Sequence, residues 1–401
     1  MARRKLHYQP LKFDRWAWLT VALFALGIVV RVLLYFPLAA YQIDSDGVIA
    51  GLCAFRIAEG HYPLFFPGGV RLGAASCYLA AAYFHVVGPG RVGLALTGLT
   101  WGILYLAFTL LFLRATLGRR LACLGFVFAV IPTEQFMTVT YPPWAYGEIM
   151  ASCSATLWLA TLWRNQSKPW QRFGFGLSAG LGIWLSLETL MISLPAIIWI
   201  ALKRHRTLLR ELIAALIGVI VGAAPWLVAN VGYGFPTLTN NWASQPVSGP
   251  GQVLDNLWFL FSNLLPKLLW HWSGWGWEST VFLMGFIVVA AGFVLAPAAK
   301  RSEAILIGLV VVATAIIFSL SNAGTFRGWT VRYVAVLYCI VPLFCTIGLA
   351  AIWRWSRLVV VATIAALTIP NLWLYGLPGS GVRGELTDEL HNDIQLRQTL
   401  E

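Results

Sequence analysis

The chain consists largely of long apolar runs, most of them close to the length of a membrane-spanning helix, separated by short loops rich in Lys and Arg. Hydrophobic residues make up 59% of the sequence and charged residues 11%, whereas a soluble domain is about 25% charged. In lipid the backbone must satisfy its own hydrogen bonds, and a helix needs about 20 apolar residues to cross the hydrocarbon core. We therefore expect an all-α polytopic membrane protein.

The distribution of cations decides the predicted topology. The N-terminal segment 1–15 is basic, which predicts a cytoplasmic N-terminus. The apolar segment 72–88 is short and rich in small residues, so it either crosses the membrane or lies along its surface. If it lies along the surface, most of the 28 Lys and Arg residues fall on the cytoplasmic side, as the positive-inside rule requires. We therefore expect a juxtamembrane helix over 72–88.

This topology predicts about 11 transmembrane helices, with juxtamembrane helices in the first and fourth outer loops. Residues 1–375 form the expected transmembrane domain, and residues 376–401 form a short extracytoplasmic tail. The expected location is a bacterial-type inner (plasma) membrane. Basic cytoplasmic loops account for the net charge of +12, so the charge does not imply nucleic acid as a partner.

Stretch 41–69 follows the first apolar run and opens with two carboxylates, Asp44 and Asp46. The sequence predicts a helix over 46–59 that ends at a left-handed Gly60. One interpretation is structural, because acids at a helix start cap the helix and interact favourably with its positive end. The other interpretation is a carboxylate pair held for chemistry at the outer membrane surface.

Other outward-facing charges lie next to predicted spans. Glu148 is either a first-turn acid of the fourth span or a functional carboxylate. Glu188 is either a partner for a buried Arg or a substrate contact. Arg327 and Arg332, near the start of a late span, either snorkel to the interface or hold a phosphate. Arg31, inside the first span, requires a partner within the bundle.

The loop behind the first outer helix carries His61 and Tyr62, which are candidates for substrate contacts. The same region carries Cys53 and Cys77, which both face the outside in this topology, so a disulfide between them is one alternative. The chain has 6 cysteines and no CxxC pair, so its cysteines do not indicate a metal site or redox motif.

The order of these features resembles the GT-C superfamily of polyprenyl-phosphate-sugar-dependent glycosyltransferases, in particular its protein-mannosyltransferase-like and aminoarabinose-transferase-like members. The resemblance covers about residues 14–375 and includes an acidic pair after the first span, YGE ahead of the fourth and RYVAVLY in a late span. It implies that Asp46 is the first-loop catalytic carboxylate and Asp44 its neighbour. Glu148 matches the second-loop acid, and Arg332 matches a basic residue near the donor phosphate.

The resemblance implies an inverting glycosyltransferase that moves a sugar from a polyprenyl-phosphate donor to a lipid, glycan or protein acceptor on the outer face. Asp46 would deprotonate the acceptor hydroxyl, while Arg332 and Arg327 would neutralise the departing phosphate. Glu148 would orient the acceptor, or share a divalent cation such as Mg²⁺ or Mn²⁺ with Asp44 and Asp46. The alternative function is a polytopic transporter or lipid flippase, in which buried charges line a transport path.

Overall fold

Helices make up nearly all the regular structure in the computed structural model, which describes residues 15–36, 45–67, 72–140, 146–235, 237, 247, 249–270, 277–297, 300–322 and 331–376. An isolated β-bridge joins Phe65 and Gly73. The predicted all-α class is confirmed for this part of the chain. The predicted tail over 376–401 lies almost entirely outside the described residues.

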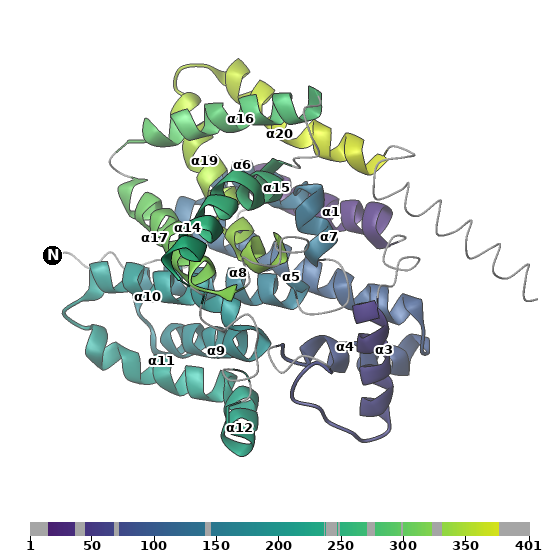
Figure 1. Cartoon of the computed structure of the whole chain (residues 1–401). Helices are drawn as coiled ribbons and strands as arrows, with labels where there is room; N and C mark the ends of the chain where they lie inside the picture. The colour runs from purple at the N-terminus through teal and green to yellow at the C-terminus, as the bar shows by residue number, and fades with distance from the viewer. Residues whose placement is uncertain are drawn as a thin grey trace, which may run out of the picture.

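Figure 1 shows how the helices follow one another along the chain. The first half contains α1 (Arg15–Val30), η1 (Arg31–Tyr35), α3 (Ser45–Ala58), α4 (Ala75–Val87), α5 (Arg91–Leu117), α6 (Arg119–Val130), α7 (Glu134–Thr140), α8 (Tyr146–Gln166), α9 (Pro169–Leu185), η2 (Leu187–Thr189) and α10 (Leu190–Arg204). The second half contains α11 (Leu208–Gly222), α12 (Ala224–Tyr233), α14 (Pro250–Phe259), η4 (Leu260–Leu264), α15 (Leu265–Trp270), α16 (Trp277–Val294), α17 (Arg301–Ser319), α18 (Val331–Val334), η7 (Ala335–Cys339), α19 (Val341–Ile352) and α20 (Arg357–Gly376).

Helices lie at the positions of the predicted spans, but only some of them meet the length and hydropathy expected of a single straight span. Within the described residues three do so, namely Arg15–Leu33, Arg91–Leu117 and Arg301–Ser319. Two bent pairs raise the number to 5, with bends of 63° between α11 and α12 and 49° between η7 and α19. The structure therefore supports a multi-pass membrane protein, and the number of about 11 spans stays a prediction.

The two bends coincide with prolines in the first turn of the second helix. Pro225 is the second residue of α12 and Pro342 is the second residue of α19. A proline has no backbone N–H and clashes with the preceding turn, so the helix before it ends or bends there. Each of these predicted spans is therefore a pair of shorter helices.

Helix α4 is 13 residues long, which corresponds to about 20 Å. The hydrocarbon core of a bilayer is about 30 Å thick, so α4 is too short to cross it along the normal. The length of α4 therefore favours the predicted surface position of segment 72–88.

Helices α9 and α11 pack against each other along paired glycines, as the adjacent teal helices of Figure 1 illustrate. Gly176 and Gly180 of α9 contact the backbone of Ala215 and Val219 in α11. Membrane helices associate closely where small residues recur four positions apart, because the backbones then approach without side chains between them. This packing fixes the end of α9, against which the outer loop docks.

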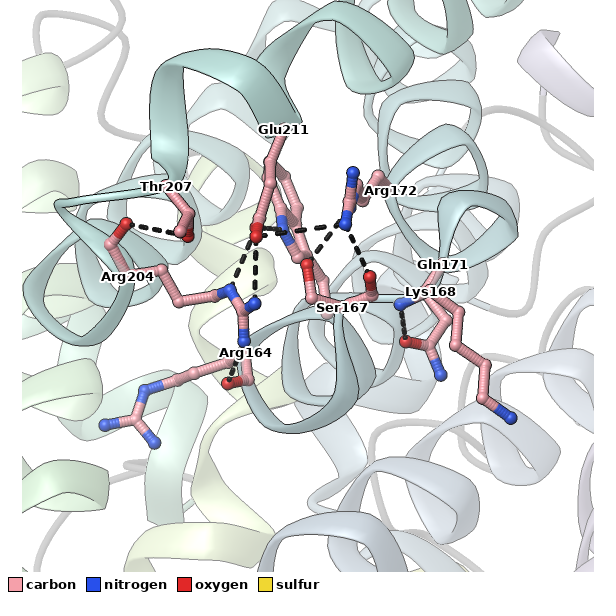
Figure 2. Close-up of polar contacts among 9 residues, drawn as sticks. Arg164, Ser167, Lys168, Gln171, Arg172, Arg204, Thr207 and Glu211 are labelled. Atoms are coloured by element: carbon pink, nitrogen blue, oxygen red, sulfur yellow. Dashed lines mark hydrogen bonds and ion pairs between the residues drawn. The ribbon is translucent and has the colours of Figure 1, made fainter. Parts of the chain in front are cut away.

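Glu211 of α11 ties four helices together at the opposite end of this layer (Figure 2). The carboxylate is 4% exposed and accepts hydrogen bonds from Arg204 Nε at 2.9 Å and Nη2 at 2.8 Å. It also accepts one from the Trp163 indole at 2.7 Å, and Arg172 lies 3.8 Å away. A bidentate Arg–carboxylate pair with a further donor is among the stronger polar contacts of a protein.

We expect Glu211→Gln to destabilise the fold, because it leaves the Arg204 charge without its buried counterion. Loss of one partner of a buried ion pair costs about 3 kcal/mol or more. The midpoint of thermal unfolding in detergent should fall clearly. Lys168→Ala is the matched control, since the Lys168 side chain points away from Glu211 in Figure 2. Equal midpoints for the two variants would contradict a structural role for Glu211.

Arg31 begins η1 and is 1% exposed, so its guanidinium lies inside the bundle. It donates hydrogen bonds to the carbonyl oxygens of Ala129 at 3.1 Å and Val130 at 3.4 Å, which are the last residues of α6, and to Gly27 at 3.1 Å. The last carbonyls of a helix have no intrahelical donor and carry its negative dipole end. Arg31 thus caps α6, and the predicted partner within the bundle includes backbone carbonyls.

Candidate active site

The first outer helix forms as the sequence predicts. Asp46 lies in the first turn of α3, and the helix ends at Ala58, followed by Gly60 with φ +91°. The N–H of His61 bonds the carbonyl of Arg56 at 2.9 Å, and the N–H of Gly60 bonds that of Ile57 at 3.0 Å. This pair of bonds is a Schellman motif, which requires a left-handed residue at the Gly60 position. The motif turns the chain sharply into the following loop.

The loop after α3 is held against the end of α9. The Trp184 indole donates to the carbonyl of Leu64 at 2.7 Å, and the N–H of Gly73 donates to the carbonyl of Leu185 at 3.0 Å. The hydroxyl of Tyr78, in α4, bonds the carbonyl of Pro63 at 3.0 Å. These backbone contacts fix the loop between α3 and α4 without using its own side chains.

The predicted substrate residues His61 and Tyr62 are exposed in this loop and line a cavity of about 710 Å³. Arg56 of α3 and Glu59, which directly follows that helix, also line it. Cys53, which contributes to the wall, lies on the inner face of α3 and is 1% exposed. The cavity is therefore polar on one side and continues to the interface of α3 with α4.

Cys53 and Cys77 meet at that interface, and both are buried free thiols. The hydrogen bond from the Cys77 thiol and the charge of Arg56 lower the pKa of Cys53, against the opposing effect of burial. A disulfide between Cys53 and Cys77 was one alternative. The two cysteines lie together in the structure, and both are free thiols. Their contact anchors α3 on α4 directly beside Ser76.

Glu148 lies in the first turn of α8 and is 1% exposed. Its Oε2 accepts a hydrogen bond from the Ser76 hydroxyl of α4. Ser76 Oγ accepts a hydrogen bond from the Trp101 indole of α5 at 3.1 Å. The second oxygen, Oε1, is buried and has no hydrogen-bond partner within the described residues. A carboxyl group buried with one oxygen unsatisfied is costly for stability, and such groups are candidates for function.

Gly147 explains how α8 reaches this position. A Cβ atom at Gly147 would lie 2.7 Å from the Thr140 carbonyl oxygen and 3.0 Å from Trp101 Cβ. Only glycine permits this close approach, so the Gly of YGE places the neighbouring carboxyl beside Trp101. Glu148 is therefore both the first-turn acid and a member of a polar cluster with α4 and α5.

Arg332 of α18 approaches the same end of α8. Its guanidinium donates a hydrogen bond to the Tyr333 hydroxyl at 3.2 Å and lies 5.2 Å from the Tyr333 ring centroid. It interacts electrostatically with Tyr146, the first residue of α8, and with Glu188 of η2. Tyr146, which interacts with the predicted donor-phosphate residue Arg332, is thus two residues from the predicted second-loop acid Glu148 in the same turn of α8.

The interaction of Glu188 with Arg332 agrees with the alternative in which Glu188 partners an Arg. Asp46 shares a face of α3 with Ala50 and Cys53, at spacings of four and seven residues, and this is the face that carries the contact with Cys77. Asp46 is half-buried, at the outer end of this face.

Two predicted site residues, Asp44 and Arg327, lie outside the described residues. Among the residues that are described, no three His, Cys, Asp or Glu side chains gather closely enough to hold a metal ion. The ligands of the divalent cation expected on Asp44, Asp46 and Glu148 are therefore described only in part, and this cation stays a prediction.

Sequence reasoning missed Ser76 and Trp101, which contact Glu148 or its donor. Both lie in segments correctly predicted as helical, but a lone Ser or Trp in an apolar run carries no local signal of a polar contact. The 72 residues between Ser76 and Glu148 make this contact purely tertiary.

Comparisons with known proteins find a likeness in fold but no match in sequence. No family model matches the sequence, and no curated protein matches it. Solved structures match closely in fold. ArnT from Cupriavidus metallidurans bound to undecaprenyl phosphate superposes with a TM-score of 0.60 at 14% identity, over 87% of this chain and 62% of that chain. The chain has the GT-C fold. The archaeal oligosaccharyltransferase AglB from Archaeoglobus fulgidus, in complex with an inhibitory peptide and a dolichol-phosphate, superposes with a TM-score of 0.51 at 12% identity, over 93% of this chain and 56% of that chain.

The GT-C fold predicted from the order of sequence features is thus confirmed. The chain spans 62% of the length of ArnT, and identities near 14% carry the likeness in fold alone. The GT-C likeness and the polar cluster around Glu148 are independent observations, since the cluster is defined by contacts within this chain.

Proposed function

We propose that this chain is an inverting glycosyltransferase that transfers a sugar from a polyprenyl-phosphate donor to an acceptor hydroxyl on the extracytoplasmic face of the membrane. The observation that carries the proposal is that one turn of α8 holds both a buried acid, Glu148, and Tyr146, which interacts with the cation Arg332, in a chain with the GT-C fold. ArnT, of the same fold, has been solved with undecaprenyl phosphate, which supports a lipid-linked donor.

The chemistry follows from the donor. A polyprenyl-phosphate sugar already carries a good leaving group, so the enzyme needs a base and a site for negative charge. The acceptor oxygen attacks C1 of the sugar, its proton passes to the Asp46 carboxylate, and the C1–O bond breaks with its electron pair left on the phosphate. Direct displacement at C1 inverts the anomeric centre. In this proposal Glu148 orients the acceptor, and Arg332 and Arg327 bind the phosphate.

The proposed substrate path uses the cavity that His61 and Tyr62 line, with Glu188 holding Arg332 in place. The acceptor in this proposal is a lipid, glycan or protein hydroxyl that reaches the cavity from outside. A divalent Mg²⁺ or Mn²⁺ ion on Asp44, Asp46 and Glu148 would be consistent with their oxygen ligands, but no step here depends on it.

The decisive experiment combines lipid analysis with transfer. The purified protein should retain polyprenyl-phosphate lipid, detected by mass spectrometry of the extract, and should release polyprenyl phosphate from a polyprenyl-phosphate sugar when an acceptor is added. A protein that moves the intact lipid-linked sugar across vesicles without breaking the C1–O bond would be a flippase, and the proposal would be wrong.

Arg332 provides a test of the donor end. We expect Arg332→Ala to weaken donor binding, because a phosphate at the membrane edge loses its charged partner. Arg332→Lys should restore only part of the affinity, because an ammonium lacks the planar fork of a guanidinium. The readout is the dissociation constant for a polyprenyl phosphate in detergent. Tyr333→Phe is the control, as it removes only the hydroxyl that Arg332 contacts. Unchanged affinity in both Arg332 variants would remove Arg332 from the donor site.

A further inference from the structure

A second cavity, of about 630 Å³, lies between α1, α5, α6 and α19. Its walls are mainly aliphatic, formed by Leu19, Leu23, Leu121, Leu124, Val127 and Ile347 among others. Ligand pockets of proteins commonly have volumes of about 300–1,000 Å³ and apolar walls with a few polar groups. The size and lining therefore suit a flexible apolar chain rather than a single water molecule or ion.

The charged side chains that line this cavity are all positive. Arg120, Lys300 and Arg354 line it, and none of the lining residues is acidic. Trp16 and Trp353 also line it, and the Arg120 guanidinium lies 5.5 Å from the Trp16 ring centroid. Three cations around an apolar cavity, with indole rings beside them, are arranged as for an anionic group attached to a hydrocarbon chain.

The cavity is far from the candidate active site. Leu117 lines the cavity and Trp101 belongs to the cluster around Glu148, and both lie on the continuous helix α5. The 16 residues between them correspond to about 24 Å along the helix axis. This distance approaches the hydrocarbon thickness of a bilayer, about 30 Å, so the two sites lie toward opposite membrane faces.

Helix α1 indicates where the occupant comes from. It exposes Trp18, Val21, Leu26 and Val29, and such a row of exposed apolar side chains on a membrane-spanning helix faces lipid. Leu19 is 41% exposed and also lines the cavity. The cavity wall is therefore continuous with the lipid-facing surface, which gives an acyl chain a lateral path that a soluble metabolite would not use.

We propose that this cavity binds an acidic glycerophospholipid of the surrounding bilayer. Its phosphate contacts Arg120, Lys300 and Arg354, and an acyl chain lies along the leucine-rich wall. The site is distinct from the proposed donor site, and the inference needs only that the chain spans a membrane. It therefore stands or falls independently of the glycosyltransferase proposal.

The test compares phosphatidylglycerol with phosphatidylcholine on the full chain in detergent. Native mass spectrometry should detect phosphatidylglycerol bound to the wild type, and added phosphatidylglycerol should raise its unfolding midpoint more than phosphatidylcholine does. In the variant Arg120→Ala/Lys300→Ala/Arg354→Ala the affinity should fall on the order of 100-fold, since each cation strengthens binding to an anionic lipid about fivefold.

The control variant, Lys168→Ala/Arg206→Ala/Arg210→Ala, removes the same charge from exposed positions that do not line the cavity. It should retain phosphatidylglycerol. A single substitution, Ala350→Trp, should obstruct the cavity and displace the acyl chain while keeping all three cations. If both triple variants lose phosphatidylglycerol binding equally, net charge alone accounts for the effect and the proposal is overturned. Retention of polyprenyl phosphate in preference to phosphatidylglycerol would overturn the identity of the occupant.

Discussion

Glu148→Gln should reduce the rate of sugar transfer by about 10²-fold, the loss expected when the acceptor is no longer held in the orientation for attack. Gln has the same shape as Glu and keeps an oxygen that accepts the Ser76 hydroxyl, so the cluster around α4 and α5 should remain folded. It cannot carry a negative charge or take up a proton. The measurement is the transfer rate with a polyprenyl-phosphate sugar, together with the unfolding midpoint and the affinity for donor lipid.

The chain offers a closely matched control in Glu303. This residue also lies in the first turn of its helix, α17, and its Oε2 is also buried without a hydrogen-bond partner within the described residues. It contributes to the electrostatic surroundings of Arg164 and Lys203, not to those of Glu148. If Glu303→Gln and Glu148→Gln reduce transfer equally, Glu148 acts only as a first-turn acid. Such an acid stabilises its helix through the helix dipole, typically by about 0.3–1 kcal/mol.

Ser76→Ala separates position from charge at the same site. The carboxyl group remains, but it loses the hydroxyl that holds Oε2 and the link to Trp101. We therefore expect a smaller loss of transfer than for Glu148→Gln, with a change in acceptor KM greater than the change in kcat. This outcome would identify Ser76 as a positioning residue.

The outline of the fold was accessible from sequence because a membrane limits the structures that a chain can form. Apolar runs predicted where the helices lie, and the sequence around Gly60 predicted how α3 ends, since only a left-handed residue permits that turn. The bends at the starts of α12 and α19 were less evident. Pro225 and Pro342 were visible in the sequence, but their effect on the direction of a span depends on the helices packed around them.

The site shows where sequence reasoning ends. The sequence pattern indicated Glu148 by its position ahead of an apolar run, but the contacts around that residue come from Ser76 and Trp101 on other helices. The sequence also predicted a partner for Arg31 within the bundle, and two of the groups that Arg31 contacts are carbonyls at the end of α6. Every residue carries such a carbonyl, so no residue type marks it. Which carbonyls are left without donors is decided by where a helix ends in the folded chain.

Asp46→Asn should reduce transfer by about 10²–10⁴-fold, the range for loss of a general base, while leaving folding and donor binding largely intact. Asn has nearly the size of Asp, so a purely structural Asp46 in the first turn of α3 would lose only its interaction with the helix dipole, about 0.3–1 kcal/mol, and the fold would tolerate the change. An amide cannot accept the proton of an acceptor hydroxyl, so a catalytic base would not tolerate it. Asp255→Asn, at an exposed position of α14, is the control for the loss of one carboxylate elsewhere.

The double variant Asp46→Asn/Glu148→Gln then tests whether the two acids belong to one site. Residues that act together in one reaction show strongly non-additive losses, whereas independent residues lose rate additively within roughly 0.5 kcal/mol. A double variant no slower than Asp46→Asn alone would mean that Glu148 acts only when the base is present, as expected if it orients the acceptor toward Asp46. Full activity of Asp46→Asn with a confirmed polyprenyl-phosphate sugar would exclude Asp46 as the base and leave Glu148 as the other described residue among the three predicted catalytic acids.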